Sequence, residues 1–260
     1  MGCRVMGILN VTPDSFSDGG RWSDPDRAVA HGLALAAGGA DVVDVGGEST
    51  RPGAEPVGEG EERRRVLPVV AALAPHVRVS VDTRKAGVAE AAIEAGATLV
   101  NDVSASLWPV AAAAGGEVGW VAMHMQGEPA TMQRRPRYGD VVGEVKSFLL
   151  ERAAAARDAG VGEVWVDPGI GFGKTLEHNL ALLAHLRHLV GSGFPVLVGT
   201  SRKGFLGALT GEPATGDRLE ASLATAVWAA TQGAAMVRVH DVAPTVDALR
   251  LAARSVPVPG

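Results

Sequence analysis

Short apolar runs alternate with longer amphipathic segments along most of the chain. The runs are rich in Val and Leu, which is typical of buried strands, and the segments between them carry apolar residues at helical spacing. Seven helices are predicted between the strands, and an eighth, Pro244–Ser255, follows the last strand. The predicted strands are Val5–Val11, Asp41–Gly46, Val77–Asp82, Leu99–Val103, Trp120–His124, Glu163–Asp167, Pro195–Thr200 and Met236–His240.

The ends of some helices are marked by specific residues. A Ser-Asp-Pro sequence at 23–25 supplies a capping residue and a first-turn proline for the helix through Arg27–Ala37. Apolar residues recur at helical spacing through Leu176–Val190 and Gly191 follows them, so this segment is predicted as one helix. The weakest predicted helix is the short segment Pro109–Ala114.

Eight repeats of a strand followed by a helix predict an α/β fold, a (β/α)8 TIM barrel. An open doubly wound sheet is the alternative, but it usually has a G-x-G-x-x-G turn after its first strand, and that turn is absent here. No linker, repeat or low-complexity segment divides the chain. We therefore expect a single domain over residues 1–260.

Composition narrows the possible functions. The net charge of −5 argues against a generic nucleic-acid-binding protein. No apolar run approaches the ~20 residues of a membrane helix, so no membrane partner is expected. The chain does not open on a secretory leader, and its single cysteine, Cys3, favours a reducing compartment. These features predict a cytoplasmic protein.

Polar residues gather where the predicted strands end. A (β/α)8 barrel forms its active site from the carboxyl ends of its strands. The opposite ends of the strands here are far less polar, and a purely structural barrel gives no reason for that difference. The polar positions are Asn10, 48–53, 82–84, 101–102, 123–126, 167–174, 201–203 and 238–241.

Positive charge is concentrated after the last two strands. Arg238 and His240 are two residues apart on a strand, so their side chains emerge on the same face. Arg202 and Lys203 end the preceding strand, and Arg51 lies in a loop rich in Gly and Pro. This arrangement suits a phosphate-containing anion, which barrels often bind near their last two strands. The alternative is a solvated strand end.

Two carboxylates and an amide also end strands. Asp82 and Asp167 could bind a metal, accept hydrogen bonds from a ligand or act as bases, and Asn101 offers both a donor and an acceptor. Asp102 is expected to face the opposite side of its strand and to have a structural role. Asp44, inside the second strand, is equally compatible with a structural role.

Two other features give weak signals. The histidines 178, 185 and 188 lie on one predicted helix, where surface or packing roles are expected, and no group of residues has the spacing of a structural zinc site. The Gly-Phe-Gly-Lys sequence at 171–174 is similar to part of a phosphate-binding loop, but the full G-x-x-x-x-G-K-[ST] spacing is absent.

Taken together, the strand ends resemble the dihydropteroate synthases, pterin-binding barrels of the folate pathway that sulfonamides target. One motif lies at each strand, in the family's order. The motifs are NVTPDSFSDGG from Asn10, DVGGESTRPG from Asp44, SVDTRK from Ser80, NDVS from Asn101, MHMQG from Met123, DPGIGFGK from Asp167, GTSRK from Gly199 and RVHD from Arg238.

The resemblance implies a transferase. Members of the family condense 6-hydroxymethyl-7,8-dihydropterin pyrophosphate with p-aminobenzoate, which gives 7,8-dihydropteroate and pyrophosphate. The C–O bond breaks early and the aromatic amine captures the resulting cation. The resemblance further implies a Mg²⁺ cofactor held in part by Asn10, and a homodimer. The segment Leu219–Gln232 could form the dimer contact, although it would serve equally well as a core helix.

The resemblance implies that the segments 11–20 and 51–61 are lids over the second substrate. It also assigns roles to individual residues. Asp82, Lys203 and Arg51 would be catalytic. Three further sets would bind the ligands: the pterin by Asp82, Asn101, Met123, Asp167, Phe172 and Lys203; the pyrophosphate by Thr50, Arg51, Arg238 and His240; and p-aminobenzoate by Phe16, Pro52, Phe172, Lys203 and Gly204.

Two alternatives share the barrel. A pterin-dependent methyltransferase would use the same pterin-binding residues, but it gives no reason for the motifs from 50–53, Ser201 and Arg238 to occur together. An inactive pterin-binding paralogue would be expected to lose the pyrophosphate and lid residues first, and these are all present.

Overall fold

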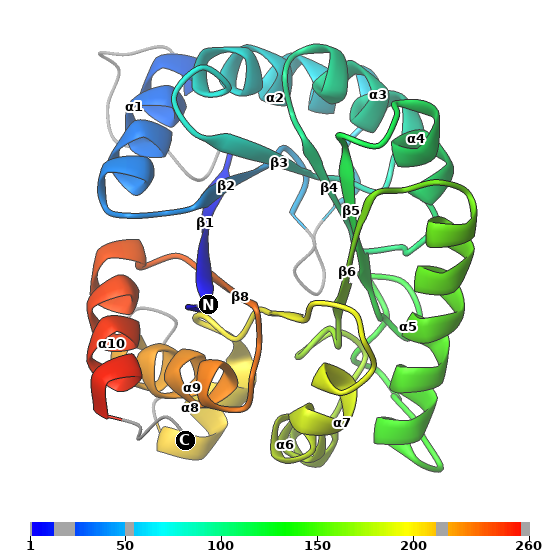
Figure 1. The fold of residues 1–260 in the computed structure, drawn as a ribbon, viewed down its shortest axis with the longest axis vertical. Coiled ribbons are helices and arrows are strands. Elements are labelled where there is room, and N and C mark those ends of the chain that lie inside the picture. The colour runs from blue at the N-terminus through cyan, green and yellow to red at the C-terminus, as the bar shows by residue number, and fades with distance from the viewer. Residues whose placement is uncertain (1, 13–23, 50–54, 212–217, 256–260) are drawn as a thin grey trace.

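A computed structural model of the chain describes residues 2–12, 24–49, 55–211 and 218–255. Strands and helices alternate, with helices arranged around the outside of the strands (Figure 1). The strands are β1 (Arg4–Asn10), β2 (Val42–Gly46), β3 (Arg78–Asp82), β4 (Leu99–Asp102), β5 (Gly119–Met123), β6 (Glu163–Asp167), β7 (Leu197–Val198) and β8 (Met236–Val239).

Ten helices lie within these described ranges, and adjacent ones pack on each other, as α1 does on α2 and α9 on α10. They are α1 (Asp24–Ala37), α2 (Glu59–Leu73), α3 (Ala86–Glu94), α4 (Trp108–Ala113), α5 (Val141–Asp158), α6 (Leu176–Ala184), α7 (Leu186–Val190), α8 (Gly204–Thr210), α9 (Leu219–Thr231) and α10 (Val242–Ser255). None of these helices is long and apolar enough to cross a bilayer.

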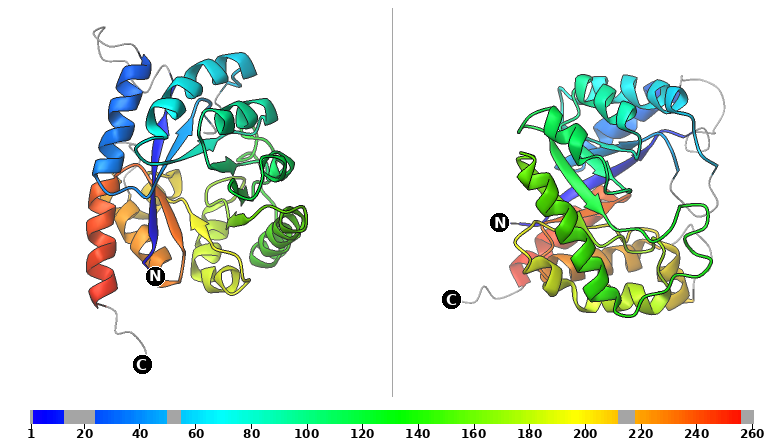
Figure 2. Two further views of the ribbon diagram at one scale, coloured as in Figure 1. Left: turned by 45° about the horizontal axis from the view of Figure 1, so that its top comes forward. Right: turned by 90° about the vertical axis from the view of Figure 1, so that its right-hand side faces the viewer.

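The strands form a closed parallel barrel. β1 pairs with both β2 and β8, so the first and last strands are neighbours. The ring closes between β6 and β7, where Val166 bridges to Val196 and its N–H donates to the Pro195 carbonyl at 3.1 Å. The predicted (β/α)8 barrel is therefore confirmed. The long loop after β5 lies on the side of the barrel opposite the N-terminus (Figure 2, right).

Side chains that point into the barrel are stacked in layers, because alternate residues of a strand face the same side. One layer is apolar and almost fully buried, and its members belong to seven strands. Two residues further along several of these strands the inward positions become polar, as in the step from Val42 to Asp44 or from Met236 to Arg238. The apolar layer consists of Met6, Val42, Leu99, Val121, Trp165, Leu197 and Met236.

The structure differs from the predicted elements in three places. The segment predicted as one helix, 176–190, is two helices that meet at His185, whose backbone (φ −105°, ψ 20°) leaves the helical region. Leu186 and Leu189 are buried after this break. No Gly or Pro marks the break in the sequence. β7 is shorter than predicted. The prediction lacks α8, which is followed by Gly211 in a left-handed conformation.

Asp102 anchors the loop after β4, as its predicted structural role requires. Its carboxylate is fully buried on the outer side of the barrel wall. One oxygen accepts from the Leu107 N–H at 2.6 Å and from the Trp120 indole N–H at 3.1 Å, and the other accepts from the Ser104 N–H at 2.8 Å. One side chain thus satisfies several buried donors that have no helix or sheet partner.

Replacing Asp102 with Ala should lower the free energy of unfolding by about 3 kcal/mol or more, because at least two buried donors lose their acceptor. Urea denaturation followed by circular dichroism would measure this. The matched control is Ser104→Ala, which removes one exposed partner of the same carboxylate and should cost less than about 1 kcal/mol. Equal losses in the two variants would contradict this role for Asp102.

Candidate active site

An arginine lies between two carboxylates inside the barrel. The Nε of Arg238 donates to Asp44 Oδ2 at 2.6 Å, and its Nη2 donates to Asp82 Oδ2 at 2.7 Å. Asp44 Oδ2 also accepts from the Asn101 Nδ2 at 2.9 Å. These three bonds join β2, β3, β4 and β8 inside the barrel, directly above the apolar layer.

Three buried oxygens near this point have no hydrogen-bond partner among the described residues. They are Asp44 Oδ1, Asp82 Oδ1 and the Ser80 hydroxyl. A buried acceptor without a donor costs free energy, so such atoms generally mark the place of a ligand or an ordered water. The polar layer is therefore suited to a ligand that brings N–H donors or positive charge.

The carboxyl group of Asp82 is held in an unusual electrostatic environment. Burial raises the pKa of Asp82 to about 7, although the Arg238 guanidinium acts in the opposite direction. The neighbouring carboxylates of Asp44 and Glu62 add to the rise in this pKa. Asp82 therefore changes charge near neutral pH.

Asp167 and Lys203 face the same region from the other side of the barrel. Asp167 Oδ1 accepts from the Gly169 N–H at 2.7 Å, and burial raises the pKa of this carboxyl group. The Lys203 ammonium donates to the Ile170 carbonyl and lies 4.7 Å from the centre of the Phe172 ring. Burial lowers the pKa of Lys203 to about 8.

The turn after β7 separates two neighbouring cations. Arg202 has a left-handed backbone (φ 56°), and its side chain turns outward to Asp241, with bonds of 3.0 and 2.6 Å. Ser201, one residue earlier, has its hydroxyl 3.1 Å from Nδ1 of His240. Of the two cations predicted at this strand end, Lys203 is therefore the one that faces the site.

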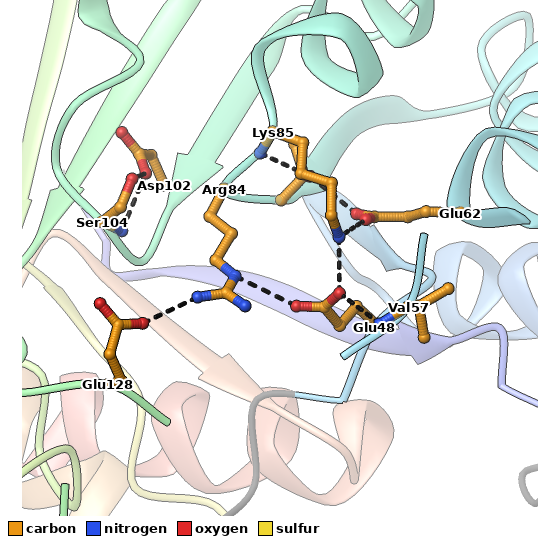
Figure 3. A network of polar contacts seen from close by, with 9 residues as sticks. Glu48, Val57, Glu62, Arg84, Lys85, Asp102, Ser104 and Glu128 are labelled. Atoms are coloured by element: carbon orange, nitrogen blue, oxygen red, sulfur yellow. Dashed lines mark hydrogen bonds and ion pairs between the residues drawn. The ribbon is translucent and has the colours of Figure 1, made fainter. Parts of the chain in front are cut away.

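A network of ion pairs supports the loop after β2 (Figure 3). The Glu48 carboxylate accepts from Lys85 at 2.5 Å, from Arg84 at 3.2 Å and from the Val57 N–H at 2.9 Å. Burial opposes ionisation of Glu48, but these donors lower its pKa. Lys85 also pairs with the fully buried Glu62. Glu48 precedes the segment 49–56 and its carboxylate bonds to Val57, which follows it, so this one side chain links the two ends of the segment.

The chain is similar in sequence to proteins of one family. The family described as "Pterin binding enzyme" matches residues 6–240. Dihydropteroate synthase of Escherichia coli (strain K12) is 48% identical over 254 residues, which cover 95% of this chain and 90% of that protein. The chain belongs to the dihydropteroate synthase family.

Solved structures of family members have the same fold. Dihydropteroate synthase of Xanthomonas albilineans with 4-aminobenzoic acid has a TM-score of 0.91 and 49% identity, covering 98% of this chain and 94% of that one. The enzyme of the same organism in complex with 7,8-dihydropteroate has a TM-score of 0.88 and 46% identity, covering 98% and 95%. The family predicted from the strand ends is confirmed.

Most of the residues expected from the family resemblance end strands of this barrel or follow them directly. The structure brings Asp82, Asn101 and Arg238 into one hydrogen-bonded group and places Phe172 against Lys203. The others lie at the same end of the barrel: Asn10, Met123, Asp167, Gly204 and His240. Four candidates lie outside the described residues: Phe16, Thr50, Arg51 and Pro52.

Asp44 is the main addition to the candidate site. Its position inside the second strand left its role open in the sequence, whereas the structure makes it the shared partner of Arg238 and Asn101. A charged residue in an otherwise apolar buried strand is itself a signal, because such a group needs partners inside the protein. The partners, however, lie 57 and 194 residues away in the chain.

The pKa of Asp82 predicts the pH dependence of turnover. With a pKa of about 7 in the free enzyme, Asp82 is ionised above that pH and protonated below it. If ionised Asp82 stabilises positive charge on the pterin, kcat/KM for the pterin substrate should fall about tenfold per pH unit below about pH 7.

The control is Asp82→Asn, whose side chain cannot titrate. This variant should have a low kcat/KM, and its kcat/KM should not show the fall below about pH 7 that is expected of the wild type (the acidic limb of the pH profile). Initial rates from pH 5 to 9 would test the assignment. An acidic limb of the same shape in both proteins would mean that another group, such as the substrate, causes it.

Proposed function

We propose that this chain condenses 6-hydroxymethyl-7,8-dihydropterin pyrophosphate with p-aminobenzoate to form 7,8-dihydropteroate and pyrophosphate. The observation that carries the proposal is the buried polar layer, in which Asp44 and Asp82 keep unpartnered oxygens beside Arg238. A dihydropterin ring supplies N–H donors to such a layer, and it carries positive charge when the pyrophosphate leaves.

The side chains around this layer are oriented to bind a pterin edge. An ionised Asp44 can only accept hydrogen bonds, so the Asn101 NH₂ group must face it and the Asn101 oxygen is directed elsewhere, as an acceptor. The Asp167 carboxylate would accept the paired N–H groups of the ring, while Lys203 would donate to its oxygen and nitrogen atoms. Met123 and Phe172 would pack on its faces.

The pyrophosphate would bind at the end of β8. The guanidinium of Arg238 uses two of its five N–H groups on Asp44 and Asp82. We assign other N–H groups of Arg238, together with His240 and with Thr50 and Arg51, to the leaving phosphates. Such donors stabilise charge that develops on oxygen, which lowers the barrier to bond cleavage.

The reaction requires little proton transfer. The C–O bond breaks first and its electron pair leaves with the pyrophosphate. Ionised Asp82 then lies beside the cation on the pterin and stabilises it electrostatically. The amine of p-aminobenzoate attacks the exposed carbon and afterwards loses one proton. An aromatic amine is uncharged at neutral pH, so no strong base is needed.

A Mg²⁺ ion fits this proposal as a partner of the pyrophosphate. Amide oxygens suit Mg²⁺, which usually binds through few protein ligands and several phosphate or water oxygens. Asn10, at the end of β1, is the residue that the family resemblance suggests would help to hold it. The described residues contain no cluster of three acidic, His or Cys side chains. The bound ion would neutralise charge on the leaving group.

The second substrate would bind near α8. Phe16, Pro52 and Phe172 would form the apolar walls for p-aminobenzoate, and Lys203 and Gly204 would contact its carboxylate. Gly204 is exposed and is the first residue of α8. Lids from 11–20 and from the loop before α2 would exclude water, which would otherwise trap the cation. The predicted second lid, 51–61, is too long at its end, because α2 begins at Glu59.

We also propose a cytoplasmic homodimer. The outer surface around α9 is partly apolar, with Trp228 47% exposed and Leu209 of the adjacent α8 51% exposed. Exposed large apolar side chains of this kind are common where subunits meet. The single thiol, Cys3, is compatible with a reducing compartment.

The proposed reaction predicts that pyrophosphate is released in equal amount to dihydropteroate. The purified chain would be incubated with the dihydropterin pyrophosphate and Mg²⁺, with and without p-aminobenzoate, and both products measured. A sulfonamide should block product formation. Tight pterin binding without any product that depends on p-aminobenzoate would overturn the proposal and favour a binding protein or a methyltransferase.

Replacing Lys203 with Ala should lower kcat/KM for the pterin substrate by about 10- to 150-fold, because a charge-assisted contact worth about 1.5–3 kcal/mol is lost. The matched control is Arg202→Ala. It removes the adjacent cation, whose exposed ion pair with Asp241 contributes little, so the loss should stay below about threefold. An unchanged kcat/KM in Lys203→Ala would remove Lys203 from the site.

A further inference from the structure

Lys174 is the last residue of the DPGIGFGK segment, and it is buried, with 3% of its surface exposed. Its ammonium lies within hydrogen-bond distance of three backbone carbonyls, those of Phe172 (2.9 Å), Gly169 (3.0 Å) and His124 (3.2 Å). It also lies 3.0 Å from the Nδ1 atom of His124. Within the part of the chain that the structure describes, no carboxylate forms a salt bridge with this ammonium.

These contacts join two different loops. His124 directly follows Met123, the last residue of β5. Gly169 and Phe172 follow Asp167, the last residue of β6. One ammonium therefore connects the two loops. Met123 and Asp167 directly precede these loops and Phe172 lies within the second, and all three are candidate pterin-binding residues. The position of the ammonium also excludes a role as a phosphate ligand in a Gly-Phe-Gly-Lys loop, because its donors point to backbone oxygens.

The backbones of the two loops approach each other closely. Gly169 and Gly173 have positive φ angles of 63° and 60°. A Cβ added at Gly169 would lie 1.9 Å from the His124 carbonyl oxygen, and one added at Gly173 would lie 2.3 Å from that of Gln126. Only glycine fits at such positions. Carbonyl oxygens from both loops converge as a result, and a cation between them offsets their mutual repulsion.

The imidazole of His124 is the fourth group around the ammonium; together with the carbonyls of His124, Gly169 and Phe172 it forms what we call the cage. Burial lowers the pKa of Lys174 to about 7. In its ammonium form Lys174 only donates, so Nδ1 of His124 then accepts and the ring proton is on Nε2. The ring packs edge-on against Phe148, with 5.0 Å between ring centres. Burial, and then the Lys174 charge, lower the pKa of His124 to about 3, so it stays neutral at ordinary pH. Tyr138, which lies later in the β5 loop, donates to the Gly173 carbonyl at 2.9 Å and so adds a second link to the β6 loop.

We propose that Lys174 is a positioning residue for the pterin substrate: its ammonium holds the β5 and β6 loops at the separation at which Met123, Asp167 and Phe172 contact one ring. This inference rests on the proposed function, because it assumes that these three side chains bind the pterin. Lys174 touches no reacting atom. It acts through the backbone that carries the three side chains.

The test compares Lys174→Met, which keeps the length of the side chain but removes its charge, with Lys174→Ala, which leaves room at the cage. Lys174→Met should lower kcat/KM for the dihydropterin pyrophosphate by about tenfold or more, since small displacements of binding groups are costly. Ethylammonium should restore activity at least about threefold in Lys174→Ala but not in Lys174→Met, whose side chain fills the space.

Two controls separate positioning from general damage to the fold. Lys146→Met removes a partly buried lysine on α5 that is not among the contacts of the Lys174 ammonium, and should change kcat/KM by less than about twofold. Circular dichroism and thermal unfolding would confirm that each variant is folded. If Lys174→Met does not fold, His124→Gln, which changes one partner of the ammonium, should still lower kcat/KM by about threefold or more.

The inference and the proposed function fail in different ways. Wild-type protein that forms no dihydropteroate would overturn the proposed function alone. The inference could then still be tested, because calorimetry can compare the binding of pteroic acid to wild type and to Lys174→Met without turnover. A Lys174→Met protein that binds pteroic acid as wild type does, and keeps wild-type kcat/KM where turnover exists, would overturn the inference. Loss of activity in Lys174→Ala that no small amine restores would also overturn it.

Discussion

The pairing of Arg238 with Asp44 and Asp82 is the interaction on which the rest of the site depends. Moving one arginine and two carboxylates out of water is costly, and the arrangement is tolerable only because each charge faces an opposite one. Two carboxylates and one guanidinium leave an excess of negative charge when all are ionised. The interior of the free protein therefore favours a ligand that brings hydrogen-bond donors or positive charge. Positive charge develops on the pterin when the pyrophosphate departs.

The barrel supplies the conditions under which this pairing is effective. The apolar layer below it, which includes Trp165 and Leu197, excludes water from one side and lowers the local dielectric constant. The strand pleat places polar residues one layer higher without any change of backbone direction. The same geometry that packs the core therefore also sets the height at which Asp82, Asn101 and Asp167 emerge.

Much of this arrangement is predictable from the sequence, because it follows from local patterns. Apolar runs and polar strand ends predict the barrel and its functional side, and the alternation of Asn101 and Asp102 assigns one to the interior and the other to the wall. The break at His185 has no such signal, since no Gly or Pro marks it and the leucine spacing continues across it. The partners of Lys174 are also unpredictable, because they are backbone carbonyls that converge only in three dimensions.

The carboxylate of Glu48 has a consequence for how this protein can evolve. By bonding to Val57 and to the lysine and arginine after β3, it fixes where the segment 49–56 leaves the barrel and where it returns. Substitution of Glu48 would disturb both ends of the segment that carries Thr50, Arg51 and Pro52, so the protein can change this segment only while it keeps that carboxylate.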